Sequence, residues 1–156
     1  MKYLAVVLLT TLFFSIPLSK MSGNTNYKQC LLFVKSSENI PDAEVCAWGF
    51  AKQRTTLQFP QLSKLIERIE QPDRVFYTKY PIKLRDALCY GFVKSSDMSI
   101  HIWLSGSLEE DIDTLTHEYS HYIAMSLAKT EMIEGVDFIE FQYWVDSTRH
   151  WAVANN

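Results

Sequence analysis

The feature that most constrains the fold is a short alternating strand followed at once by a long helix. Within Ser99–Ser105, the apolar residues Ile100, Ile102 and Leu104 occupy every second position. In an extended strand these three side chains point to one face and their polar neighbours to the other. The pattern therefore predicts a half-buried strand with its apolar face in the core.

The helix that follows has a clear start signal. Ser107 and Glu110 have the spacing of a capping box, with Ser107 as the N-cap residue. Asp111 and Asp113 add negative charge close to the helix N-terminus, where the helix dipole favours it. We expect this helix to run to about Lys129, with its apolar side chains packed on the sheet.

Six other segments carry patterns of regular structure. Four of them favour helices: Pro41–Gln53, Phe59–Ile69, Ile82–Cys89 and Asp137–Val153. The signals include a proline in the first turn of the first segment and apolar residues at helical spacing in the second. Short runs favour strands over Val75–Tyr80 and Phe92–Lys94, the second ending in a turn at Ser95–Asp97. The fold class expected is α+β, with a small antiparallel or mixed sheet and helices packed on it.

The length of 156 residues and the 47% of hydrophobic residues favour one domain. Lys2 precedes an apolar run, Tyr3–Leu18, which resembles a secretory signal and is short for a membrane span. No A-x-A cleavage triplet follows, so an uncleaved anchor stays open. We expect a signal or anchor over 1–19, a linker over 20–29 and one compact domain over 30–156, outside the cytoplasm.

Charge and cysteine content limit the partners and the covalent framework. The net charge is -3 and no basic stripe is present, so the composition excludes nucleic acid as the expected partner. A membrane contact is expected only through an uncleaved N-terminal segment. The chain has three cysteines, Cys30, Cys46 and Cys89. In an exported domain one pair could form a disulfide, but the sequence does not choose the pair.

One turn of the long helix carries a metal-binding pattern. His117 and His121 are four residues apart, which places both imidazoles on one helix face. Zinc can bind both nitrogens at about 2.0–2.1 Å. Glu118 lies one residue on and can reach a metal-bound water without being a ligand itself, as in the H-E-x-x-H motif. The alternative is a helix with two surface histidines and a solvated glutamate.

Ser99–Ser105, followed by Glu109–Ala128 with His117-Glu118-x-x-His121, resembles the core of the zincin metallopeptidases. The resemblance covers about the last third of the chain. In that superfamily a sheet-edge strand lies beside the active-site helix and binds extended substrate. The resemblance therefore implies a zincin-like fold, a Zn²⁺ cofactor, and a peptide lying along Ser99–Ser105.

The third zinc ligand separates branches of this superfamily. The metzincin extension requires a glycine and a third histidine, and Ala124 and Leu127 stand at those positions. In the gluzincin branch a glutamate from a second helix is the third ligand, which here implies Glu140, 19 positions after His121. A helix-capping role for Glu140 stays open. Trp144 stands where many gluzincins have an acidic residue. The reserve ligands are Glu131, Glu134, Asp137 and His150.

The resemblance implies a zinc peptidase in which Glu118 is the general base. His101, Trp103, Tyr143 and His150 are candidate substrate-binding residues, and Arg149 is a further candidate donor to the oxyanion. Two other functions stay open: a catalytically inactive zincin-fold binding module, and a membrane-anchored interaction protein. Substrate specificity and oligomeric state are not predicted.

Overall fold

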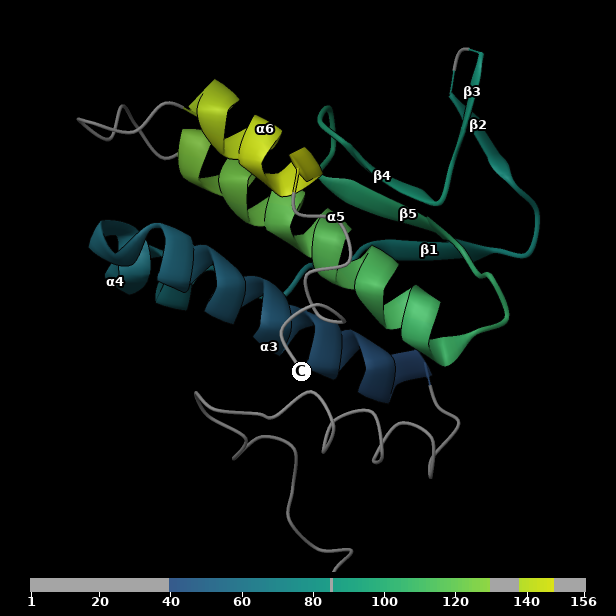
Figure 1. Ribbon diagram of the computed structural model, residues 1–156, viewed down its shortest axis with the longest axis horizontal. Coiled ribbons are helices and arrows are strands. Elements are labelled where there is room, and N and C mark those ends of the chain that lie inside the picture. The colour runs from purple at the N-terminus through teal and green to yellow at the C-terminus, as the bar shows by residue number, and fades with distance from the viewer. Residues whose placement is uncertain (1–39, 85, 130–137, 148–156) are drawn as a thin grey trace, which may run out of the picture.

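The fold is α+β. The computed structural model describes residues 40–84, 86–129 and 138–147 (Figure 1). In chain order the elements are α3 (Ile40–Gln58), the short 3₁₀ helix η2 (Pro60–Leu62), α4 (Ser63–Arg68), β1 (Val75–Thr78), β2 (Ile82–Leu84), β3 (Ala87–Cys89), β4 (Gly91–Lys94), β5 (Ser99–Trp103), α5 (Leu108–Lys129) and α6 (Phe138–Ser147).

Strand β5 lies at the centre of the main sheet. It pairs parallel with β1 and antiparallel with β4, in the order β1-β5-β4. The alternation predicted for this strand is present, because Ile100 and Ile102 are fully buried while His101 and Trp103 on the opposite face are half-buried. Strands β2 and β3 form a separate antiparallel hairpin. The mixed sheet expected from the sequence is therefore present.

Helices α3 and α5 run side by side, α5 packs on strands β4 and β5, and α6 packs on α5 (Figure 1). Small residues at helical spacing on α3 allow α5 to approach closely. The core contains the buried apolar side chains of both helices and of β5, and burial of this surface is the main stabilising contribution. Its largest members include Phe50, Ile100, Ile102, Ile112, Leu115, Tyr119, Ile123, Phe141 and Val145.

Helix α5 begins and ends where the sequence predicts. It starts at Leu108, directly after Ser107, whose hydroxyl accepts a hydrogen bond from the Glu110 backbone N–H at 3.5 Å. It ends at Lys129. The Asp111 carboxylate bonds the backbone N–H of Ser105 at 2.8 Å, which fixes the loop between strand and helix. The loop between β5 and α5 is therefore bonded to the first turn of the helix that carries His117.

Other boundaries differ from the expectations. Helix α3 continues to Gln58 rather than Gln53, β1 ends at Thr78, and the helix expected over Phe59–Ile69 is divided into η2 and α4. Phe59, with φ of -126° and ψ of 67°, is not helical and precedes η2, and Leu62, the last residue of η2, has φ of -95° and ψ of 0° directly before α4. The expected helix over Asp137–Val153 is present as α6 from Phe138 to Ser147, and its remainder lies outside the described residues.

The prediction of a helix over Ile82–Cys89 is wrong. The segment is a hairpin in which Ile82 pairs with Cys89, Lys83 with Leu88 and Leu84 with Ala87. Its side chains alternate between the two ribbon faces, and a helix of eight residues without an apolar face to bury would be unstable alone.

Cys46 is disulfide-bonded, and its partner lies outside the described residues, whereas Cys89 is a free thiol. The predicted leader over 1–19 and linker over 20–29 also lie outside them. In the described part of the chain, no helix combines the length and apolar character that crossing a bilayer requires.

Candidate metal centre

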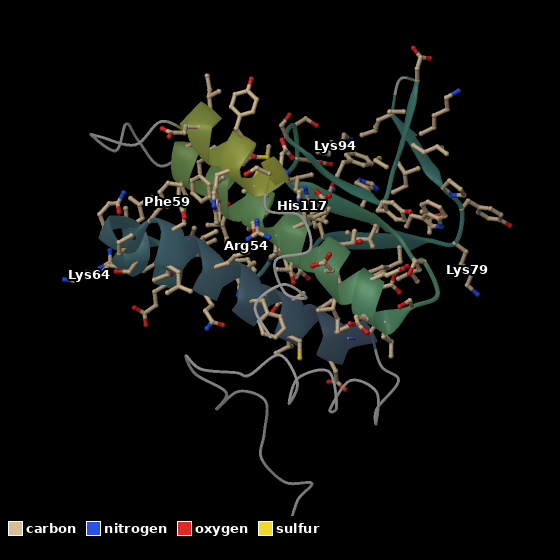
Figure 2. The ribbon with its side chains drawn as sticks, in the orientation of Figure 1. Arg54, Phe59, Lys64, Lys79, Lys94 and His117 are labelled. Carbon is tan, nitrogen blue, oxygen red and sulfur yellow. The ribbon has the colours of Figure 1, made fainter. Side chains whose placement is uncertain are left out.

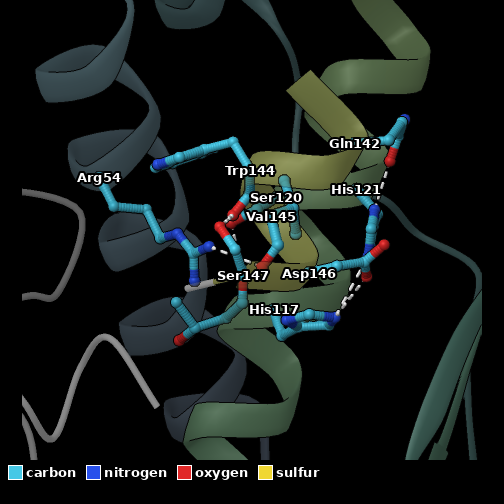
Figure 3. Close-up of polar contacts among 10 residues, drawn as sticks. Arg54, His117, Ser120, His121, Gln142, Trp144, Val145, Asp146 and Ser147 are labelled. Atoms are coloured by element: carbon cyan, nitrogen blue, oxygen red, sulfur yellow. Dashed lines mark hydrogen bonds and ion pairs between the residues drawn. The ribbon is translucent and has the colours of Figure 1, made fainter. Parts of the chain in front are cut away.

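The two histidines of α5 point to the same gap between α5 and α6 (Figure 3). Their Nε2 atoms are 3.1 Å apart, and the ring planes are inclined at 80°. Both side chains are largely buried, with 18% and 17% of the side-chain surface exposed. The spacing of four residues therefore brings two nitrogen lone pairs to one point, as expected from the sequence.

The acidic group beside this pair comes from α6 and is Asp146. Its Oδ1 atom lies 3.0 Å from His121 Nε2 and 3.6 Å from His117 Nε2 (Figure 3). Among the described residues, His117, His121 and Asp146 form the one group of metal-ligating side chains whose donor atoms lie within 4.8 Å of one another.

Glu140, the ligand implied by the resemblance, is exposed and is not in this group. It opens α6, whereas Asp146 lies six residues further along the helix and faces α5. The structure therefore brings Asp146 to the histidines where Glu140 was expected. The reserve ligands Glu131, Glu134, Asp137 and His150 lie outside the described residues.

The donor triangle fits a small tetrahedral cation. Ligand atoms at about 2.0–2.1 Å from a tetrahedral zinc are roughly 3.3 Å from one another. The three donor separations here are 3.0, 3.1 and 3.6 Å. Two imidazole nitrogens and one carboxylate oxygen are also donors that zinc accepts, and three ligands leave one position open. The residues therefore fit zinc in both geometry and chemistry.

Gln142 fixes the chemical state of one histidine. Its side-chain oxygen contacts His121 Nδ1 (Figure 3), and this oxygen accepts a hydrogen bond in the tautomer that carries its proton on Nδ1. In the neutral ring, Nε2 then presents a lone pair to the gap. Asp146 Oδ1, also an acceptor, lies 3.0 Å from that lone pair. A metal ion placed between these two atoms would be bound by both of them.

Glu118 lies beside this gap and faces strand β4. Its side chain is buried, with 6% of the residue exposed, yet it lines the same cavity as both histidines. A β-carbon on Gly91 would lie 2.8 Å from Glu118 Cγ and 3.0 Å from its Oε1. The glycine therefore provides the space into which the carboxyl group extends.

The cavity over the site has a volume of about 810 Å³, which suits a small ligand or a short peptide. Its acidic lining residues are Glu110, Asp113, Glu118 and Asp146, and no Lys or Arg is among its described lining residues. This charge balance favours a cation at the site. Burial, and secondarily the Glu118 carboxylate, raise the pKa of the Cys89 thiol at the cavity wall, so Cys89 is not a thiolate nucleophile at neutral pH.

Arg54 of α3 holds the end of α6 that carries Asp146. Its guanidinium donates to the Val145 carbonyl at 3.5 Å and lies 4.9 Å from the centre of the Trp144 ring (Figures 2 and 3). Burial lowers the pKa of Arg54 to about 10, and the nearby Asp113 carboxylate opposes this shift. The group therefore remains a cation at neutral pH and binds the C-terminal end of α6.

Strand β5 cannot bind an extended peptide by its edge, because β1 and β4 occupy both of its sides. The cavity instead borders β4, through residues Tyr90–Val93. The Tyr90 carbonyl accepts from Trp103 N–H at 2.7 Å, so Tyr90 faces β5. In an antiparallel ladder the next residue, Gly91, and then Val93 direct their backbone groups to the other side. These groups form the outer edge of the described sheet.

Three of the predicted substrate-binding residues, His101, Trp103 and Tyr143, are not among the described residues that line the cavity. His101 stacks between Phe76 and Phe92, with ring centres 5.1 and 4.6 Å apart, and Trp103 stacks on Tyr90 at 5.0 Å. Tyr143 is 71% exposed. His150 and Arg149 lie outside the described residues.

Three residues of the site were missed from the sequence. Gln142 and Asp146 are four residues apart, so they share one face of α6, and they are polar in a helix that is otherwise rich in aromatic residues. That polar pair was a usable signal. Gly91 had none, because its importance depends on the approach of Glu118 from another element.

Comparisons of the chain with protein-family models, with curated proteins and with solved structures gave no match.

Proposed function

We propose that this chain is a zinc-dependent peptidase of zincin-like architecture, in which His117, His121 and Asp146 hold the metal and Glu118 is the general base. The proposed third ligand is Asp146 of α6 rather than Glu140, so we do not assign the chain to the gluzincin branch.

One observation carries the proposal. His121 Nε2 and the Asp146 carboxylate oxygen lie 3.0 Å apart, and His117 Nε2 lies 3.1 Å from His121 Nε2. Such a cluster of acceptors is stabilised by a shared cation. Glu118, directly after His117, places a buried carboxyl group beside the open cavity. A purely structural zinc site would have no role for this group.

Bound zinc would lower the pKa of a water to about 7 and polarise the scissile carbonyl. Glu118 accepts the proton of the attacking water and passes it to the leaving amine, so that a poor leaving group departs as a neutral molecule. Gln142 keeps the His121 lone pair directed at the site. Burial of Glu118 restricts its carboxyl group to the space beside Gly91.

The edge of β4 is the part of the site that suits a peptide. A substrate in extended form can add to the outward backbone groups of Gly91 and Val93. This arrangement brings the peptide backbone past Glu118, because Glu118 contacts the position of Gly91.

The test compares three variants of the purified chain for zinc content and for cleavage of a peptide library. Glu118→Gln should retain one zinc per chain and lose hydrolysis by at least about a hundredfold. His117→Ala should lose both. Glu110→Gln removes another carboxylate that lines the cavity and serves as the matched control, with zinc and hydrolysis unchanged.

Two results would reject parts of the proposal. Zinc bound normally, with no hydrolysis by the unmodified chain, would favour a non-catalytic binding module. Stability and metal content that do not change in His117→Ala would mean that the histidine pair holds no metal.

A further inference from the structure

The β2–β3 hairpin, residues 80–90, projects from the body of the molecule (Figure 1). It carries large apolar side chains that are open to solvent: Tyr80 is 79% exposed, Leu84 42% and Leu88 68%. A soluble domain rarely leaves several large apolar side chains exposed on one short element unless they contact another molecule.

The same region is basic in an otherwise acidic chain. Between Arg74 and Lys94 the sequence has five Lys or Arg residues and one acidic residue, a local net charge of +4 in a chain of net charge -3. Arg74 and Lys94 pair with Asp97. Lys79 and Lys83 are exposed and form no ion pair with a described residue. Lys83 of the hairpin and Lys79, directly before it, are therefore available to an anionic partner.

The arrangement of these side chains selects the class of partner. Leu84 and Ala87 pair across the ribbon on one face, whereas Lys83 and Leu88 pair on the other. Apolar side chains thus project from both faces of the ribbon near its tip, and a flat protein surface could cover only one of these faces. Lysine is also depleted in protein interfaces. Single-stranded nucleic acid stacks its bases on aromatic side chains, whereas the tip of the hairpin offers the aliphatic side chains of Leu84 and Leu88.

We propose that the β2–β3 hairpin docks on the surface of an anionic lipid bilayer. Leu84 and Leu88 enter the boundary between headgroups and acyl chains, Tyr80 lies at the interface, and Lys79 and Lys83 contact the lipid phosphates. A medium that surrounds the tip can take apolar side chains from both faces. This docking does not depend on the metal centre.

The test places a solvent-sensitive dye at the hairpin tip, so that the N-terminal apolar segment does not affect the signal. The full chain carries Leu84→Cys for labelling and Cys89→Ser to remove the free thiol. It is mixed with vesicles of phosphatidylcholine alone or with added phosphatidylglycerol. The dye emission should shift to the blue with the anionic vesicles and much less with the neutral ones.

Charge and apolar variants separate the two contributions. Lys79→Glu and Lys83→Glu should each weaken the dye response by about fivefold or more, and Leu88→Ser should weaken it to a similar extent. Controls at the other end of the molecule are Lys64→Glu on α4 (Figure 2) and Leu57→Ser in the last turn of α3 (Figure 1), and both should leave the response unchanged. Leu57 is matched to Leu88, because both are 68% exposed.

Three results would overturn the proposal. They are no shift with either vesicle, an equal shift with both, and a shift with a DNA oligonucleotide but with no vesicle. The test does not depend on the proposed peptidase activity, since the dye reports only on the hairpin.

Discussion

At the scale of single residues, the position of the Glu118 carboxyl group depends on Gly91 having no side chain. Any β-carbon there would lie 2.8 Å from Glu118 Cγ, closer than two carbon atoms can approach. We expect Gly91→Ala to displace the carboxyl group. Zinc content should be unchanged, while kcat falls by about ten- to a hundredfold, because small misplacements of a reacting group reduce rate strongly. Steady-state kinetics and metal analysis measure both quantities.

Gly49 provides the matched control, since a β-carbon there meets no atom within 4 Å. Gly49→Ala should raise the free energy of unfolding by about 0.5–1 kcal/mol without a change in kcat, because alanine favours the helix. Normal kcat in Gly91→Ala would mean that Glu118 is not confined as described.

Asp146 and Glu140 make opposite predictions for metal affinity. Asp146→Asn removes the negative donor next to His121 and should weaken zinc binding by at least about a hundredfold. Glu140→Gln removes an exposed carboxylate and should leave the affinity unchanged. A competition titration with a zinc chelator measures both. The reverse ranking would restore the ligand implied by the sequence resemblance.

Gln142 should influence zinc through the tautomer of His121. Replacing it with leucine removes the acceptor at Nδ1 and should weaken zinc binding by about ten- to a hundredfold, the usual effect of a lost partner of a metal ligand. The same chelator titration serves. An affinity equal to that of the unmodified chain would show that the ring needs no such partner.

At the scale of elements, α6 is held on the body by an apolar face and by one cation. Phe141 and Val145 are fully buried, and the Phe141 ring lies 4.3 Å from that of Phe59. Arg54 binds the Val145 carbonyl next to Asp146. The element that supplies the third donor is therefore positioned from α3, through Arg54.

Arg54→Met keeps much of the length of this side chain and removes its charge. It should lower the free energy of unfolding by about 2 kcal/mol, because the carbonyl and Asp113 lose their buried partner. Hydrogen exchange over Phe138–Ser147 should become faster. Lys64→Met, on the exposed side of α4, is the control and should change neither quantity. If the rate of hydrogen exchange in α6 does not change, apolar packing alone holds this helix in place.

Elements with a strong local signal could be predicted from the sequence, and those set by tertiary contacts could not. Helix α5 has its capping residue and a continuous apolar face, so its bounds were predictable. The hairpin at 82–89 was predicted as a helix, because three-residue strands are too short to show a period. The central position of β5 depends on pairing with β1, 21 or more residues earlier, which no local pattern contains.

The candidate site divides in the same way. The pair His117 and His121 and the neighbouring Glu118 follow from helical geometry alone. The third donor depends on which face of α6 meets α5, and that packing places Asp146 at the gap and leaves Glu140 exposed. The spacing of 19 residues between His121 and Glu140 therefore did not indicate which acidic side chain lies beside the histidines.

At the scale of the whole molecule, two tyrosines in the interior limit stability at high pH. Burial is the main cause that raises the pKa of Tyr77 and Tyr119 above the ordinary value of 10.0, and Glu44 adds to it in both cases. Below about pH 10 these tyrosines are protonated in both the folded and the unfolded chain. Above it the unfolded chain ionises and the folded chain does not, so stability is lost as pH rises.

We therefore expect the free energy of unfolding to fall between about pH 10 and about pH 11, by up to about 1.4 kcal/mol per pH unit for the fully buried Tyr119 and by less for Tyr77, which is only half-buried. Urea denaturation across this range measures the slope. In Tyr119→Phe the slope should be smaller, whereas Tyr143→Phe, at an exposed position, should retain it. A flat profile in the unmodified chain would contradict the burial of these hydroxyl groups.

If one zinc ion is shared by His117, His121 and Asp146, it will be visible in a crystal structure of the chain grown with zinc, with anomalous scattering recorded at the zinc edge. We predict a single strong peak at about 2.0–2.1 Å from the two histidine Nε2 atoms and an Asp146 carboxylate oxygen. A peak bound by Glu140 instead, or histidine rings without a peak between them, would contradict it.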